Sequence, residues 1–150
     1  MGVDIDIANE CAAPVEVAFA YADDYRNATH WLSGIQKFEP AGEQDQGLGA
    51  VFDASMHVGA TLHSTIKVDG WVKNELISFE AIKGFPVRSV WHFEAVDENT
   101  TRIRAHIHYD LPGGLAGKAL GRMIEPFVKM SVKHSSAALR KCIEAAAASA

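Results

Sequence analysis

The sequence predicts an α+β fold, with an antiparallel sheet of about seven strands, two short helices after the first strand and one long C-terminal helix. Three observations predict it. Residues 35–109 alternate apolar and polar side chains at period two, with only short turn segments between the runs. After Pro112 the apolar residues recur at three- and four-residue steps. Ahead of both regions, one alternating run precedes two segments with helix-start signals.

The elements can be assigned in chain order. VDIDIA, residues 3–8, alternates apolar and acidic residues as a half-buried strand does. Pro14 suits the first turn of a helix, which we expect over Pro14–Asp23. Asp24 can cap a second short helix that continues through Trp31 and Leu32. Six strands follow, joined by turns so short that neighbours must be antiparallel: Ile35–Pro40, Ala50–Val58, Leu62–Val72, Leu76–Ile82, Val87–Val96 and Arg102–Tyr109.

The alternation also assigns side chains to the two faces of the sheet, because successive residues of a strand point opposite ways. In the last hairpin we expect Phe93 to lie opposite Ala105. Trp91 then lies opposite Ile107, and both apolar sets share the inner face. The rest of the expected inward set is Phe52, Ala54, Met56, Leu62, Ser64, Ile66, Val68, Ile77, Phe79, Ala81 and Ser89.

The C-terminal helix is amphipathic, and Pro126 should kink it near its first third because proline removes a helical hydrogen bond. Charged residues recur on its other side, as expected of a solvated stripe. The expected buried stripe is Leu120, Ile124, Phe127, Val128, Ser131, Ser135, Leu139 and Cys142.

The glycine-rich segment YDLPGGLAGKALG, residues 109–121, does not match a phosphate-binding loop. That loop needs glycine five residues before its Gly-Lys pair and Ser or Thr just after it, whereas Gly117-Lys118 has Pro112 and Ala119 at those positions. The segment also leaves an antiparallel meander rather than a parallel sheet. We therefore interpret the glycines as residues that allow a turn with positive φ and close packing.

Length and composition are those of one globular domain over residues 1–150, with 48% hydrophobic and 22% charged residues arguing against disorder. A net charge of −5 does not support a nucleic-acid partner. The first ten residues include acids and no apolar stretch, so no signal peptide is expected, and no segment has the apolar length of a membrane span. Cys11 and Cys142 lack metal-ligand spacing, and we interpret them as reduced thiols of a cytoplasmic protein.

Four segments carry a resemblance to a known family: APVEVAFAYADDYRNATHWL, GEQDQGLGAVF, WHFEAVDENTTRIR and YDLPGGLAGKALGRMIEPFV. With the order of elements, they resemble the START superfamily, also called SRPBCC, and within it the polyketide cyclase/dehydrase branch. The resemblance covers nearly the whole chain. It implies the helix-grip fold, in which a curved sheet wraps around the long C-terminal helix, and an apolar cavity for a lipid-like, polyketide or other hydrophobic ligand. No cofactor is expected.

The residues give this cavity partial support of their own. The inward set mixes large aromatic side chains with small ones and places several hydroxyl groups inside, which is typical of a small-molecule pocket. A filled core with serines bonded to nearby carbonyl groups is the alternative. We expect the ligand to contact Met56, Ser64, Phe79, Ser89, Trp91, Phe93, Tyr109, Phe127 and Ser131.

An enzyme needs an acid or base inside this cavity. The alternation turns every Asp, Glu, Lys, Arg and His of residues 50–109 outward and leaves Tyr109 as the titratable side chain within. His134 falls at the expected margin of the pocket. Tyr109 and His134 are thus the weak catalytic candidates, and binding or transport is favoured over a cyclase or dehydratase reaction. An interaction module that uses the outer sheet face is the third hypothesis.

Three histidines are predicted to gather on that outer face. In the expected register His92 lies opposite His106, with His108 two residues further on, which is a workable geometry for zinc. Nearby arginines oppose a cation, and Asp110, the one acid in view, is expected to pair with Arg88. We therefore assign no metal and interpret the face as a polar surface that can serve a homodimer contact.

Overall fold

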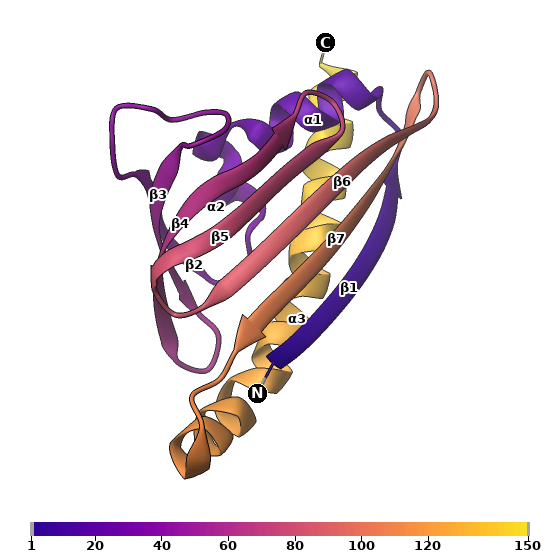
Figure 1. Cartoon of the computed structure of the whole chain (residues 1–150). Coiled ribbons are helices and arrows are strands. Elements are labelled where there is room, and N and C mark those ends of the chain that lie inside the picture. The colour runs from indigo at the N-terminus through magenta and orange to yellow at the C-terminus, as the bar shows by residue number, and fades with distance from the viewer. Residues whose placement is uncertain (1, 150) are drawn as a thin grey trace.

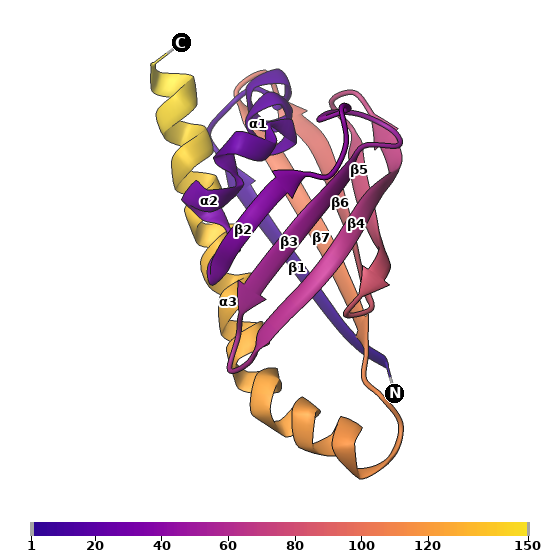
Figure 2. The ribbon, with the colours of Figure 1, turned by 90° about the vertical axis from the view of Figure 1, so that its left-hand side faces the viewer.

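A computed structural model describes residues 2–149 of the chain. One antiparallel sheet curls over a long C-terminal helix (Figures 1 and 2). The seven strands are ordered β1-β7-β6-β5-β4-β3-β2, so the first strand pairs with the last and forms one edge of the sheet. This is the predicted helix-grip arrangement. The strands are β1 (Gly2–Cys11), β2 (Ile35–Pro40), β3 (Val51–His57), β4 (Thr61–Val72), β5 (Leu76–Gly84), β6 (Val87–Asp97) and β7 (Thr100–Asp110).

The helices lie on the inner side of the sheet. α1 (Val15–Asp23) follows β1, and a short 3₁₀ turn η1 (Tyr25–Asn27) leads into α2 (Ala28–Trp31). The Asp24 carboxylate accepts a hydrogen bond from the backbone N–H of Arg26, which is the capping role predicted for it. α3 (Gly114–Ala148) contacts β1, α1 and α2. None of the helices within residues 2–149 has the length and hydropathy of a membrane span.

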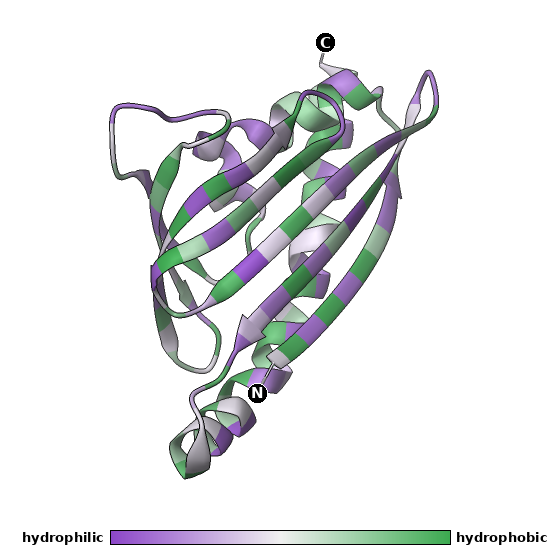
Figure 3. Ribbon diagram, viewed as in Figure 1, coloured by the Kyte–Doolittle hydropathy of each residue, from purple (hydrophilic) through white to green (hydrophobic). Residues whose placement is uncertain are grey.

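Alternation along the strands sorts the side chains as predicted, and apolar and polar residues follow one another along them in Figure 3. The register of the β6–β7 hairpin, however, differs from the prediction by two residues. Trp91 pairs with Ala105, and Phe93 pairs with Ile103. A β-bulge between Ala95 and Asp97 shifts the pairing next to the turn. A two-residue slip leaves every side chain on its own face, so hydrophobic patterning cannot detect it.

α3 consists of two parts with different surroundings. Figure 2 shows that its first third runs at an angle to the remainder and extends beyond the sheet, as expected for a helix that contains Pro126. The C-terminal part packs on the sheet, and Leu139 and Ile143 are fully buried there. Large apolar side chains of the first part are instead exposed: Leu115, Met123, Phe127 and Met130. The predicted burial of Phe127 is therefore wrong: the β3–β4 turn meets one side of its ring and leaves the residue half exposed, whereas Ile124, three residues earlier, is fully buried.

The glycines after β7 serve local geometry. Gly114 has a φ of +76°, in the left-handed region where glycine is favoured. Gly117 is buried so tightly that an added Cβ would lie 1.5 Å from the carbonyl oxygen of Pro112. The close-packing role predicted for the segment is thus confirmed at Gly117.

Candidate functional site

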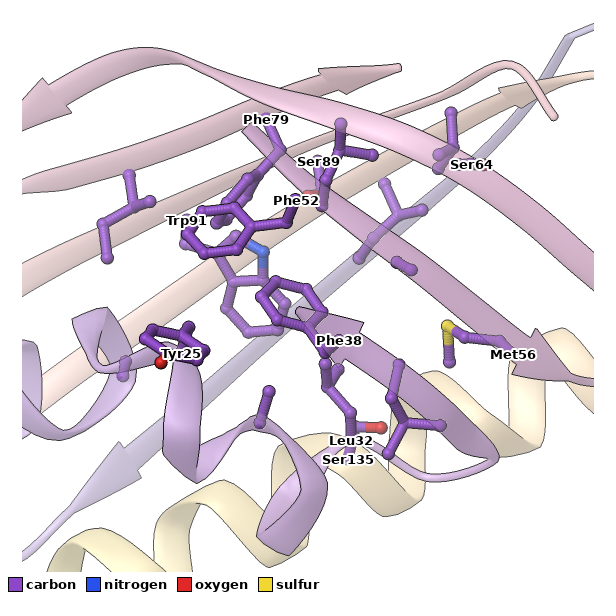
Figure 4. A pocket seen from close by; sticks show the side chains of 18 of the residues that line it. Tyr25, Leu32, Phe38, Phe52, Met56, Ser64, Phe79, Ser89, Trp91 and Ser135 are labelled. Atoms are coloured by element: carbon purple, nitrogen blue, oxygen red, sulfur yellow. The ribbon is translucent and has the colours of Figure 1, made fainter. Parts of the chain in front are cut away.

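A cavity of about 240 Å³ lies between the inner face of the sheet and the helices η1, α2 and α3. Most of its wall is aromatic or aliphatic. In Figure 4, Tyr25, Phe38, Phe52 and Trp91 converge on one space from the sheet and the helical side. The Phe38 and Phe52 rings are stacked with centroids 5.0 Å apart, and the Tyr25 ring lies 5.8 Å from that of Phe52. Such a concave, largely apolar space is typical of small-molecule sites.

Eight of the residues that we expected to contact a ligand line this cavity: Met56, Ser64, Phe79, Ser89, Trp91, Phe93, Tyr109 and Ser131. Phe127 is not among the lining residues, and its side chain is 51% exposed. Its ring packs at the β3–β4 turn, where a Cβ added to Gly59 would lie 2.7 Å from it. Val128 and Val132 supply the apolar wall from α3 instead.

Two of the serines expected to contact a ligand donate their hydroxyl protons to the protein. Ser64 Oγ donates to the carbonyl oxygen of Phe85 across 2.7 Å. Ser131 Oγ donates to the carbonyl oxygen of Ser33 across 2.8 Å, and Ser135 Oγ accepts from the N–H of Ser33 across 2.9 Å. Since each hydroxyl has one proton, Ser64 and Ser131 keep only acceptor capacity for a ligand.

A family comparison bears on this geometry. The family model described as polyketide cyclase/dehydrase and lipid transport matches residues 3–144. The chain belongs to this family. The predicted resemblance to the polyketide cyclase/dehydrase branch is thereby confirmed.

Solved structures with the same fold superpose on nearly the whole chain. A protein from Thermus thermophilus superposes with a TM-score of 0.80 at 18% identity, covering 96% of this chain and 99% of that one. The Zhui aromatase/cyclase from Streptomyces sp. R1128 has a TM-score of 0.78 at 15% identity, with 96% and 94% covered. A START superfamily protein from Mycobacterium smegmatis gives 0.76 at 13% identity, with 94% and 97% covered. At these identities the likeness shows the fold alone. No curated protein matches the sequence.

Tyr109 lies inside, as predicted, with 2% of its surface exposed and its ring 5.8 Å from that of Phe85. Burial, and after it the nearby charge of Glu125, raises the pKa of the Tyr109 phenol. The phenol therefore stays protonated at neutral pH and can donate a hydrogen bond. His134, the other weak catalytic candidate, is exposed on α3 and does not line the cavity.

Trp31 is a cavity residue that sequence reasoning missed. It ends α2, lines the cavity and meets Trp91 edge to face, with ring centroids 5.4 Å apart and planes at 78°. Its indole Nε1 is buried, and no hydrogen-bond partner satisfies it. Among the side chains of residues 2–149, Trp31 Nε1 is the single buried nitrogen or oxygen atom that lacks a hydrogen-bond partner. A tryptophan beside a predicted helix end signals burial, but nothing in the sequence signals a missing partner.

Acidic residues from the segments beside the sheet lie at one side of the cavity, and this corrects the expectation that Tyr109 alone is titratable there. The lining includes Asp23, Asp24 and Asp45. Asp23 accepts hydrogen bonds from Trp71 Nε1 across 2.9 Å and from Gln46 Nε2 across 2.6 Å. The latter contact joins the 41–50 loop to the end of α1. Among the described residues, those lining the cavity include no Lys, Arg or His.

A second, more open groove lies beside the cavity, where β4 and β6 begin. Leu62 and Phe85 line both spaces, so these two side chains separate them. The groove continues along residues 110–112 to Leu120 of α3.

The outer-face histidines do not form the predicted cluster of three. His92 pairs with Arg104 rather than His106, because of the register difference described above. The other two rings face carboxylates instead: His106 contacts Asp6 and Asp4 across 2.6 and 3.0 Å. Within the described residues no group of three His, Cys, Asp or Glu side chains is arranged to hold a metal ion.

The partners of this face also differ from the expected ones. His108 contacts Asp4 and Asp110 across 2.9 and 3.1 Å. The pairing expected between Arg88 and Asp110 is wrong, since Arg88 binds Asp69 across 2.6 Å and Glu80 across 3.5 Å. Asp4 and Asp6 lie on β1, which pairs with β7. The proximity of these aspartates to the two histidines follows from the pairing of the first strand with the last.

Proposed function

We propose that the chain binds or transports a hydrophobic small molecule in the cavity between the sheet and the helices. The observation that carries this proposal is an unfilled cavity whose wall consists largely of aromatic and aliphatic side chains. A folded core normally closes such space, because empty volume forfeits dispersion contacts. Membership in a family described as polyketide cyclase/dehydrase and lipid transport supports the same conclusion.

The size of the cavity limits the ligand. An apolar protein cavity of roughly 150 Å³ accommodates benzene, whereas pockets for drug-sized molecules span roughly 300–1,000 Å³. The 240 Å³ present here lie between these limits. A compact molecule of about two fused rings therefore fits better than a long-chain lipid or an extended polyketide.

Cavity filling tests the proposal. Ala54 of β3 lines the cavity, so the larger side chain of Ala54→Leu should occupy part of it. The affinity for 2-acetylnaphthalene, a compact probe with two fused rings, should fall at least tenfold. Ala95→Leu, at an exposed position of β6, is the matched control and should leave affinity unchanged. Native mass spectrometry of the purified protein should also detect a co-purified apolar molecule. Equal binding by both variants, or none by the native protein, would refute the proposal.

A cyclase or dehydratase reaction in the same cavity is the second candidate, and buried Tyr109 is the observation that favours it. A phenol with a raised pKa can protonate or hydrogen-bond a substrate oxygen but is a poor base at neutral pH. Tyr109→Phe distinguishes the candidates. Under the binding function it leaves the affinity for an apolar ligand nearly intact, whereas under the enzymatic one it abolishes turnover of a polyketide-like substrate. An interior too small for a ligand would have favoured the interaction-module hypothesis, and the 240 Å³ cavity gives it no such support.

A further inference from the structure

Trp31 presents an unused hydrogen-bond donor in a largely apolar site. Its side chain is 8% exposed, and its Nε1 has no partner in the protein. Burying an N–H without an acceptor is unfavourable, so native structures leave few such groups. The matching group of Trp71 shows the ordinary outcome, since its Nε1 donates to Asp23 across 2.9 Å. The two tryptophans share the same chemistry and differ in whether the fold supplies an acceptor.

The Trp31 ring is held firmly in place. Leu32, the residue after it, donates its N–H to the carbonyl oxygen of Ala28 across 2.9 Å. One residue further, both backbone polar groups of Ser33 are bonded to serines of α3. The Trp91 ring supports the indole edge to face. A donor fixed in this way loses little entropy when it meets an acceptor.

The charges around the cavity select against one class of acceptor. The described residues that line it include three aspartates and no cationic side chain. A carboxylate ligand would lose hydration without gaining a counter-charge from a lining residue, and Asp23 and Asp45 would repel it, whereas Asp24 is paired with Arg26 across 2.8 Å. A neutral carbonyl or ether oxygen has neither cost.

We propose that Trp31 Nε1 donates a hydrogen bond to a neutral oxygen acceptor of the bound molecule and so determines ligand specificity. The ligand class is a compact, uncharged, largely aromatic or alicyclic molecule that carries a carbonyl or ether oxygen, and carboxylates are rejected. This inference rests on the proposed binding function and adds the chemistry that the site recognises. The competing account is that the N–H points at the face of the Trp91 ring, which is a weaker interaction.

Three probes of similar shape separate these accounts: 2-acetylnaphthalene, which has a neutral acceptor, 2-ethylnaphthalene, which has none, and 2-naphthoate, which is anionic. Titrations of the native protein, followed by the indole N–H signals in ¹⁵N–¹H NMR spectra, report affinity and contact together. We expect 2-acetylnaphthalene to bind about tenfold tighter than 2-ethylnaphthalene, and 2-naphthoate weakest. The Trp31 indole signal should move downfield with the ketone alone. The Trp71 signal, already bonded to Asp23, is the internal control.

Trp31→Phe removes the donor and keeps an aromatic ring. It should reduce the preference for the ketone over the hydrocarbon from about tenfold to nearly none, while 2-ethylnaphthalene affinity falls less than about threefold. If this variant does not fold, the three titrations of the native protein still test the inference. Equal affinities for the two neutral probes, with a stationary Trp31 signal, would overturn the inference and leave the proposed function intact. Failure of all three probes to bind would count against the proposed function, and tightest binding of 2-naphthoate would overturn the charge argument.

Discussion

Ser131 Oγ on α3 donates a hydrogen bond across 2.8 Å to the carbonyl oxygen of Ser33, which lies between α2 and β2. The adjacent backbone N–H of Ser33 donates to Ser135 Oγ, one helical turn further along α3. Two serines of one helix therefore bind both polar groups of a single backbone residue. This pair of contacts fixes α2, and with it Trp31, against the long helix.

Ser131→Ala should destabilise the protein by about 1–3 kcal/mol, because it leaves the carbonyl oxygen of Ser33 without this donor in a largely buried position. Chemical denaturation measures the change. Ser149→Ala removes a similar hydroxyl bond, to Ala145, at the exposed end of α3 and should cost less than about 0.5 kcal/mol. Equal losses in the two variants would show that the Ser33 contact contributes no special stability.

Gly117→Ala should destabilise the protein by about 2 kcal/mol or more, since the added Cβ would lie 1.5 Å from the Pro112 carbonyl oxygen, and backbone cannot move away cheaply. Gly42→Ala is the matched control. Gly42 lies outside the positive-φ region and has nothing within 4 Å of an added Cβ, so the stability of the protein should change by less than about 0.5 kcal/mol. Thermal unfolding of the two variants checks the difference, and comparable melting temperatures would contradict this account of the glycine-rich segment.

His106 and His108 should make stability depend on pH. A hydrogen bond with Asp6 is the main cause that raises the pKa of His106, and one with Asp4 does the same for His108. Both nitrogens of each ring face carboxylate oxygens, so the doubly protonated ring fits best. The folded protein therefore holds these protons more tightly than the unfolded chain. Their contribution is complete below about pH 6.5 and disappears as pH rises through the folded pKa values.

The low-pH limit of this contribution comes from Asp4. Hydrogen bonding from His108 is the main cause that lowers the pKa of Asp4, so its contribution is lost as pH falls through that lowered value. Urea denaturation from about pH 5 to about pH 9 should show a smaller decline above about pH 6 for His108→Gln than for the native protein. His134→Gln, at an exposed position of α3, is the control and should keep the native slope. Arg88, which pairs with His108 between β6 and β7, forms ion pairs with Asp69 and Glu80. Its contribution to stability should therefore be the same in the native protein and both variants. Parallel profiles for the two variants would contradict the assignment.

Gln46→Ala should accelerate release of a bound ligand about three- to tenfold, because Gln46 Nε2 ties the loop beside the cavity to Asp23 across 2.6 Å. The loop retains its own bonds from the Gln44 amide to the carbonyl oxygens of Gln46 and Leu48, so folding stability should change little. Stopped-flow displacement of 2-acetylnaphthalene measures the release rate. Gln36→Ala, at an exposed position of β2, is the control, and identical rates in both variants would place the ligand's path elsewhere.

Much of the cavity wall could be predicted from period-two alternation. Met56, Phe79 and Tyr109 point inward because each occupies an alternate position on the apolar face of its strand. A two-residue error in the predicted register leaves every side chain on the same face. The register itself could not be predicted, since it depends on the bulge between Ala95 and Asp97. Phe127 shows the limit for helices: its spacing matches a buried stripe, yet the β3–β4 turn covers one side of its ring and leaves the residue half exposed. Burial requires a partner surface, and periodicity carries no information about where that surface stops.

Local pattern was thus sufficient for the order of elements, the face that each strand turns inward and the helix-grip arrangement that the family resemblance implied. Only the folded chain decided which groups meet across long sequence separations. Ser33 reaches the serines of α3, β1 brings Asp4 to the histidines of β7, and Trp31 enters the cavity wall without an acceptor. Each of these depends on how packed elements end and overlap in space. Pairwise distances of this kind have no periodic signature along the chain.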